Sequence, residues 1–240
     1  MIKLREIDDE NTALQLSPMI CSAESLLSYL IEHDEIGLTK AKAFQRKFVH
    51  WAAANFEWPG FEEEKLFSVN KVLNEYDFPP LEMLHVVLLK LKLIRHYKGA
   101  CKLTKAGNGL VDKRGELFGL IAPFYLFRVD HSAYSRFSEP ALGNWDVFLN
   151  IINVEAAHGI SGGALREVFY GPREEGDLYD HALGMLWSQV LRPLSWLGVL
   201  AEVQPEGTHG FEHRIFMKTP LWDAAFDLDT DHMLQEPLRH

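Results

Sequence analysis

The stretch "KLIRHYKGACKLTKAGNGLV", from Lys92 to Val111, decides the fold of the first half of the chain. Two short runs, at about 93–96 and 101–103, flank "YKGA", whose glycine suits a tight turn. Thr104 follows and can cap a helix. The pattern therefore predicts a β-hairpin and then a helix. The stretch is also basic within an acidic chain, so the hairpin either contacts phosphate or only closes a hydrophobic core.

The same order of elements occurs twice. The apolar helix "LEMLHVVLLKLKL" (81–93) precedes the first hairpin, and residues 190–226 repeat the order of apolar helix, hairpin, threonine and helix. This order is typical of the second half of a winged helix. Apolar periodicities upstream of each copy indicate further helices. The sequence predicts a mostly α fold with two winged-helix-like units, each of helices plus a small β-hairpin, at residues 1–128 and 141–240, joined by a linker at 129–140.

A short internal repeat carries a family resemblance. "LTKA" occurs in "GLTKAKAFQRKFV", which begins at Gly37, and again in "KLTKAGNGLV", which begins at Lys102. Residues 22–111 resemble the helical region of the plasmid ORF-three-like proteins, where an "LT" helix is followed by a second helix pair and an "LLR…G…LT..G" hairpin. The resemblance implies an uncharacterised bacterial, winged-helix-like family without an assigned activity. The β-rich first domain of the plasmid group is absent here, so no function of that domain carries over.

The charge is unevenly distributed. The net charge is −10, but residues 1–128 hold 17 basic and 17 acidic residues, whereas residues 129–240 hold 7 and 17. Any contact with phosphate is therefore expected in the first half. Cys21 and Cys101 lie far apart with no ligand-like spacing, which is typical of a reducing compartment. The sequence contains no signal-peptide pattern and no long apolar run, so we expect a cytoplasmic protein without a membrane partner.

Two basic clusters are the candidate nucleic-acid contacts. One surrounds the first "LTKA", with no acidic residue between Ile36 and Phe56; the other spans Lys90 to Arg114, where Asp112 is the one acidic residue. The helix before the hairpin is too apolar to read bases, so the contact would be to backbone phosphates. The alternative is that these are solvated faces or partners of the acidic half. The ten candidates are Lys40, Lys42, Arg46, Lys47, Lys90, Lys92, Arg95, Lys98, Lys102 and Lys105.

No pattern indicates catalysis or a metal. Most of the eleven histidines, His85 and His131 among them, lack partners at ligand spacing, and "GISGG" (159–163) is not followed by the residues of a P-loop. We therefore expect no catalytic residue, no metal, no cofactor and no enzyme activity.

The function predicted from the sequence is that of a non-catalytic cytoplasmic binding protein. Its first unit would contact nucleic acid weakly, without sequence preference, in a regulatory role. The alternative is a protein-interaction or scaffold module whose hairpins only pack, so the partner is either a nucleic-acid backbone or another protein. An enzyme with a groove between the two units ranks third.

Overall fold

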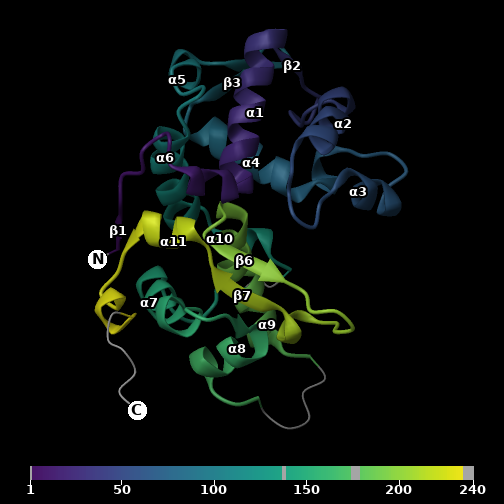
Figure 1. Cartoon of the computed structure of the whole chain (residues 1–240). Helices are drawn as coiled ribbons and strands as arrows, with labels where there is room; N and C mark the ends of the chain where they lie inside the picture. The colour runs from purple at the N-terminus through teal and green to yellow at the C-terminus, as the bar shows by residue number, and fades with distance from the viewer. Residues whose placement is uncertain (1, 137–138, 174–178, 235–240) are drawn as a thin grey trace. The chain divides into compact units, whose positions relative to one another are not determined.

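The computed structural model describes residues 2–136, 139–173 and 179–234. These residues form two units, drawn in purple to teal and in teal to yellow in Figure 1. The N-terminal unit comprises residues 6–124. The C-terminal unit comprises the described residues from 125 onward together with residues 2–5. The first residues of the chain therefore belong to the unit built by its second half.

Helix α1 (Pro18–His33) is the central element of the N-terminal unit. The Ser17 side chain caps it by accepting a hydrogen bond from the Ile20 amide, and Pro18 occupies the first helical position. Its apolar face, which includes the fully buried Leu26 and Leu27, packs against α4 and β4. The other helices of this unit are α2 (Arg46–Asn55), α3 (Glu63–Val69), α4 (Pro79–Lys90), α5 (Lys105–Asn108) and most of α6 (Arg114–Arg128), with 3-10 helices at Thr12–Leu16 and Glu75–Asp77.

The predicted hairpin is present as β3 (Ile94–Tyr97) and β4 (Ala100–Leu103). Its two-residue turn has positive φ at both positions, 50° at Lys98 and 82° at Gly99, as the tightest hairpin turns require. A third strand, β2 (Ile36–Gly37), pairs with β4, so the sheet order is β2-β4-β3. Thr104 caps α5 by accepting a hydrogen bond from the Gly107 amide at 3.0 Å. The predicted order of hairpin, threonine and helix is therefore confirmed here.

The C-terminal unit contains a second three-stranded sheet of order β5-β7-β6. Its hairpin is β6 (Leu200–Val203) and β7 (Ile215–Lys218), and β5 (Ile160–Ser161) pairs with β7. The strands β1 (Lys3–Leu4) and β8 (Phe226–Asp227) form a separate antiparallel pair. The helices are α7 (Trp145–Glu155), α8 (Gly162–Tyr170), α9 (His181–Leu186), a π-helix (Trp187–Leu191), α10 (Arg192–Leu197) and α11 (Pro220–Ala225), with 3-10 helices at His131–Tyr134, Phe211–His213 and Asp231–Leu234.

One buried amide joins several elements of the C-terminal unit. Asn153, on α7, has no solvent exposure, and its side-chain oxygen accepts hydrogen bonds from Lys218 Nζ and Trp222 Nε1, each at 2.9 Å. Its Nδ2 donates to Thr230 Oγ1 at 3.0 Å and to Asp231 Oδ1 at 2.9 Å. The full hydrogen-bonding capacity of this amide is therefore satisfied by side chains from β7, α11 and the segment after β8.

The described residues are 56% helical and 12% strand, so the chain is mostly helical, as predicted. The predicted architecture of two winged-helix-like units, each of helices plus a small β-hairpin, is wrong, because the strands form three small sheets. The sequence pattern missed β2 and β5 because two residues are too short to show alternation. It missed the pair of β1 and β8 because these strands come from opposite ends of the chain. None of the described helices is both long enough and apolar enough to span a bilayer.

Candidate nucleic-acid interface

The hairpin of the N-terminal unit presents cations and an aromatic ring on one face. Arg95 lies directly opposite Lys102 in the strand register, and the exposed Tyr97 shares their side of the sheet. The Arg95 guanidinium carbon and Lys98 Nζ lie 5.6 and 5.2 Å from the centre of the Tyr97 ring. The neighbouring positions Ile94 and Cys101 are buried on the opposite side. The hairpin therefore packs one side on the core and exposes the other.

Strand β2 brings the second basic cluster beside the tip of the hairpin. The Leu38 amide donates to the Gly99 carbonyl at 2.9 Å, and a tight turn closed by the hydrogen bond from the Thr39 amide to Ala43 O follows. Lys40 and Lys42 are exposed on this turn, and Lys42 has a φ of 65°. Two of the predicted residues in one cluster are therefore neighbours of Lys98 in the other.

The remaining candidates lie in two places. Lys92 immediately precedes β3 and Lys105 opens α5, so both lie at the base of the hairpin, where Thr104 Oγ1 donates to the Lys92 carbonyl at 2.8 Å. Lys90 ends α4 nearby. Arg46 and Lys47 begin α2, and Arg46 Nε donates to Asn74 Oδ1 at 2.9 Å. The ten residues thus fall into a group at the tip, a group at the base and a pair on α2.

Few of these cations are neutralised by the chain itself. Within the described residues, Lys102 is the one candidate with an ion pair, to Glu35 at 3.1 Å. Nine of the ten candidates are exposed, and Lys102 is half-buried. Exposed ion pairs contribute little to stability, so neither the paired nor the unpaired cations are needed to hold the hairpin together. Their charge remains available to an external anion.

A buried chain of three titratable groups lies beneath the tip. His85 Nδ1 is 2.6 Å from Glu75 Oε1, and His85 Nε2 is 2.8 Å from Nε2 of the half-buried His96 on β3. The other Glu75 oxygen accepts the Phe44 amide at 2.5 Å, and the Phe44 ring stacks on His85 with centres 3.8 Å apart. This chain fastens the turn after β2 to α4 and β3.

The charge of Lys42, on the turn after β2, affects the pKa of His96, one member of this chain. Burial lowers the pKa of His96, and the nearby charges of His85 and Lys42 lower it further, whereas Glu75 raises it. Lys42 therefore lies within electrostatic reach of β3. Sequence reasoning placed His85 among the isolated histidines and missed this chain, because residues on a 3-10 helix, an α-helix and a strand share no motif spacing. Across the described residues, no group of three or more His, Cys, Asp or Glu side chains is arranged to hold a metal ion.

Comparison with known proteins places the chain in a family. The Y4jL N-terminal domain matches residues 15–116, and the y4jL C-terminal domain matches residues 135–220. A protein of Sinorhizobium fredii (strain NBRC 101917 / NGR234), described as uncharacterized protein y4jL, is 38% identical over 172 residues, which are 70% of this chain and 76% of the relative. No solved structure matches the chain.

These matches confirm the coarse prediction of an uncharacterised bacterial family. The finer resemblance to the plasmid ORF-three-like proteins stays a prediction. Because the two matched regions together cover more than half of the sequence, and the relative matches along most of its length, the chain belongs to the y4jL family.

Proposed function

We propose that this chain is a non-catalytic binding protein whose N-terminal unit contacts the backbone of nucleic acid without reading its sequence. The observation that carries the proposal is the exposed hairpin face, where Arg95 and Lys98 flank the ring of Tyr97. Cations that neutralise phosphates release condensed counterions, and this release drives binding that is independent of sequence. Lys40 and Lys42 are exposed on the turn beside the tip and supply two further cations there.

The absence of base reading follows from α4, the helix that precedes the hairpin. Seven of its twelve residues are buried, including Leu84 and Leu88, so α4 offers no polar face to the edges of bases in a major groove. Tyr97 adds a preference for unpaired strands, because an exposed aromatic ring between cations can stack on a base of any identity. We therefore expect single-stranded nucleic acid to bind more tightly than a duplex of the same sequence.

Fluorescence anisotropy with a labelled single-stranded oligonucleotide, and with its duplex, tests the proposal at low salt. The unmodified chain should bind with a Kd in the range of about 10⁻⁴ to 10⁻⁶ M that is usual for non-specific contacts, and the affinity should fall steeply with salt. The double variant Arg95→Glu, Lys98→Glu should reduce the slope of log K against log salt by about 2, because each lost phosphate contact reduces it by about 1. Tyr97→Ala should weaken the single strand more than the duplex.

The matched control is Lys65→Glu, Lys71→Glu, which makes the same change in net charge on exposed residues of α3 and the segment after it. This control should retain most of the binding. An equal loss in the control and in the hairpin variant would assign the effect to bulk charge. No binding by the unmodified chain above about 10⁻⁴ M would remove the proposal. The protein-interaction module, in which the hairpins only pack, would then be the better explanation.

A further inference from the structure

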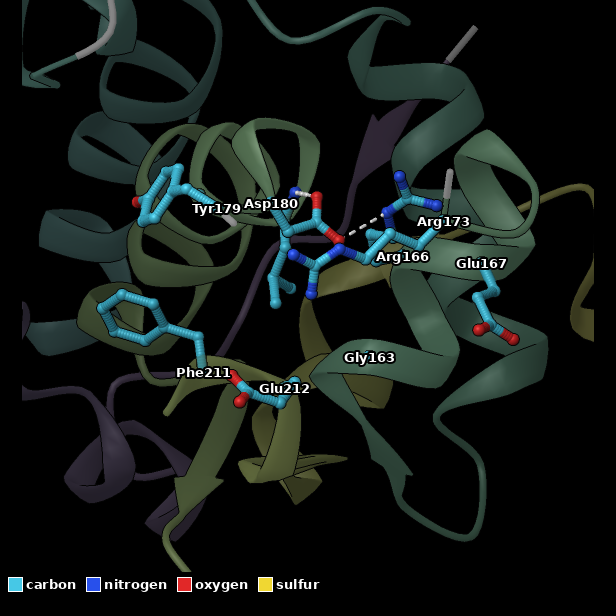
Figure 2. A pocket seen from close by; sticks show the side chains of 10 residues that line it. Gly163, Arg166, Glu167, Arg173, Tyr179, Asp180, Phe211 and Glu212 are labelled. Carbon is cyan, nitrogen blue, oxygen red and sulfur yellow. Dashed lines mark hydrogen bonds and ion pairs between the residues drawn. The ribbon is translucent and has the colours of Figure 1, made fainter. Parts of the chain in front are cut away.

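Two adjoining cavities lie in the C-terminal unit. The larger has a volume of about 320 Å³ and the smaller about 250 Å³. Figure 2 shows the larger cavity, with the ion pair between Arg166 and Asp180 on its wall. Tyr179 and Phe211 line both cavities, so the two form neighbouring parts of one depression. The larger volume lies at the lower end of the range for small-molecule sites, and the smaller lies just below that range.

The described residues that line the smaller cavity carry the opposite charge to the unit around it. Residues 129–240 contain 7 basic and 17 acidic residues, yet four of those seven line the two cavities: Arg166 and Arg173 the larger, Arg136 and Arg192 the smaller. No acidic side chain is among the described residues that line the smaller cavity. All four are arginines, whose planar guanidinium matches carboxylates and phosphates with two parallel hydrogen bonds.

Arg192 is the residue that points most clearly to a ligand. Its guanidinium carbon lies 5.4 Å from the ring centre of Trp187 and 5.1 Å from that of Trp196, and its Nη2 donates to the Tyr134 carbonyl at 3.1 Å. Within the described residues it forms no ion pair. Glu202, the carboxylate whose charge acts on Arg192, is hydrogen-bonded to Arg214 and to Trp187 Nε1. Removing a cation from water without a counter-charge is costly, and an anion in the cavity would offset that cost.

The backbone at this wall is itself unusual. Trp187–Leu191 form a π-helix between α9 and α10. Such wide turns are rare in proteins, and many of those that occur lie at functional sites. The π-helix places Trp187 and Ser188 on the cavity wall together with Arg192, which begins α10. The Ser188 hydroxyl is hydrogen-bonded to that of Ser135 at 3.0 Å, and both residues line the same cavity. Two hydroxyl groups and the Arg192 guanidinium therefore line the same cavity as Phe211, whose ring stacks on Trp187 with ring centres 4.2 Å apart.

We propose that the smaller cavity binds a small organic anion, in which a carboxylate or phosphate is held by Arg192 and Arg136. The apolar or aromatic body of the ligand lies against Phe211 and Tyr179, toward the larger cavity. Hydrogen bonds to a charged group contribute more than neutral ones, so the two arginines account for most of the affinity. The inference is independent of the nucleic-acid proposal, which concerns the other unit.

Tryptophan fluorescence provides the assay, because Trp187 forms part of the cavity wall. Sodium benzoate, inorganic phosphate and adenosine monophosphate are each titrated to about 10 mM, ten times a Kd of 1 mM, at constant ionic strength with sodium chloride as the reference. Benzoate and adenosine monophosphate test a ring with a carboxylate and a ring with a phosphate, and inorganic phosphate tests the anion alone. At least one of the three should give a saturable change that chloride does not. Trp187→Phe should remove the signal while calorimetry still detects binding.

Arg192→Gln should weaken binding about 10- to 100-fold, the range expected for loss of a charged hydrogen-bond donor. Because Arg192 packs between two tryptophans, a second variant is needed: Arg136→Gln, at an exposed position on the same cavity, should weaken binding several-fold without unfolding the unit. The control is Arg128→Gln, an exposed arginine of the same unit outside both cavities. No saturable response to any probe, or equal affinity in the cavity variants and the control, would overturn the proposal.

Discussion

Replacing Asn153 with leucine should destabilise the C-terminal unit strongly. Leucine has the same branching of heavy atoms as asparagine but bulkier terminal groups, so the change leaves no cavity and removes four hydrogen bonds. The four partners of the Asn153 side chain differ in the other hydrogen bonds and ion pairs that they would keep after the substitution. Thr230 Oγ1 still bonds Asn150, and Asp231 still pairs with Arg5, so these two lose little.

The two donors to Asn153 Oδ1 decide the magnitude. Trp222 is 1% exposed and its indole N–H would be left unsatisfied, which costs about 1–3 kcal/mol. The Lys218 side chain is 10% exposed and would keep a distant ion pair with Asp223, 3.8 Å away, so its cost is about 1–2 kcal/mol. The expected loss is about 2–5 kcal/mol, which would lower the Tm of a unit of this size by about 8–20 °C.

Urea and thermal unfolding followed by circular dichroism measure this loss. The control is Asn55→Leu, because Asn55 is exposed and its one side-chain bond is local, to the Trp51 carbonyl at 2.7 Å; it should change stability by less than about 0.5 kcal/mol. A loss below about 1 kcal/mol for Asn153→Leu, at an unchanged urea m-value, would refute the argument that the two buried donors depend on Asn153.

Three further outcomes follow from the structure. Gly107→Ala should destabilise the N-terminal unit by several kcal/mol in urea unfolding, because the new Cβ would lie 2.2 Å from the Leu93 carbonyl oxygen, which is backbone and cannot move aside; Gly119→Ala, where the Cβ meets open space, is the control. Burial lowers the pKa of His131 from 6.5 to about 4, so the unfolded state takes up the proton first. Stability should be complete above pH 6.5 and should fall by about 3 kcal/mol as the pH drops toward 4, a dependence that His131→Gln should abolish in pH-dependent unfolding. Burial raises the pKa of Cys101 to about 12, so this thiol should resist a thiol reagent at pH 8 until the unit unfolds, and modification of Cys101 in the folded protein, detected by mass spectrometry, would contradict its burial.

The parts of the fold that were predictable are those with strong local chemistry. The turn at Lys98 and Gly99, the Thr104 cap and the apolar face of α1 each follow from a few adjacent residues. The third strands were not predictable, because β2 and β5 are two residues long and exist only through pairing with β4 and β7. Their formation depends on tertiary contacts and leaves no period in the sequence.

The candidate sites also differ in whether the sequence alone reveals them. The basic residues of the hairpin stand out in the sequence because no acidic residue interrupts them. The arginine-lined cavity does not, because Arg136 and Arg192 are 56 positions apart within a strongly acidic half. Net charge averages over the whole surface and therefore conceals a local reversal of sign. The contact between Glu75 and His85 was equally hidden, since it depends on how a 3-10 helix meets α4.

The pair of β1 and β8 has a consequence for the order of folding during synthesis. β1 is made before the N-terminal unit, but its partner β8 is more than 200 residues away, and Arg5 also reaches the Ala225 and Asp223 carbonyls. The N-terminal unit, residues 6–124, has all its own strands available before any of the C-terminal sheet has been made. Its earlier folding shortens the flexible loop that must close between β1 and β8, which lowers the entropic cost of that closure. On the ribosome, the N-terminal unit would fold first. The β1–β8 pair would form only after β8 has been synthesised.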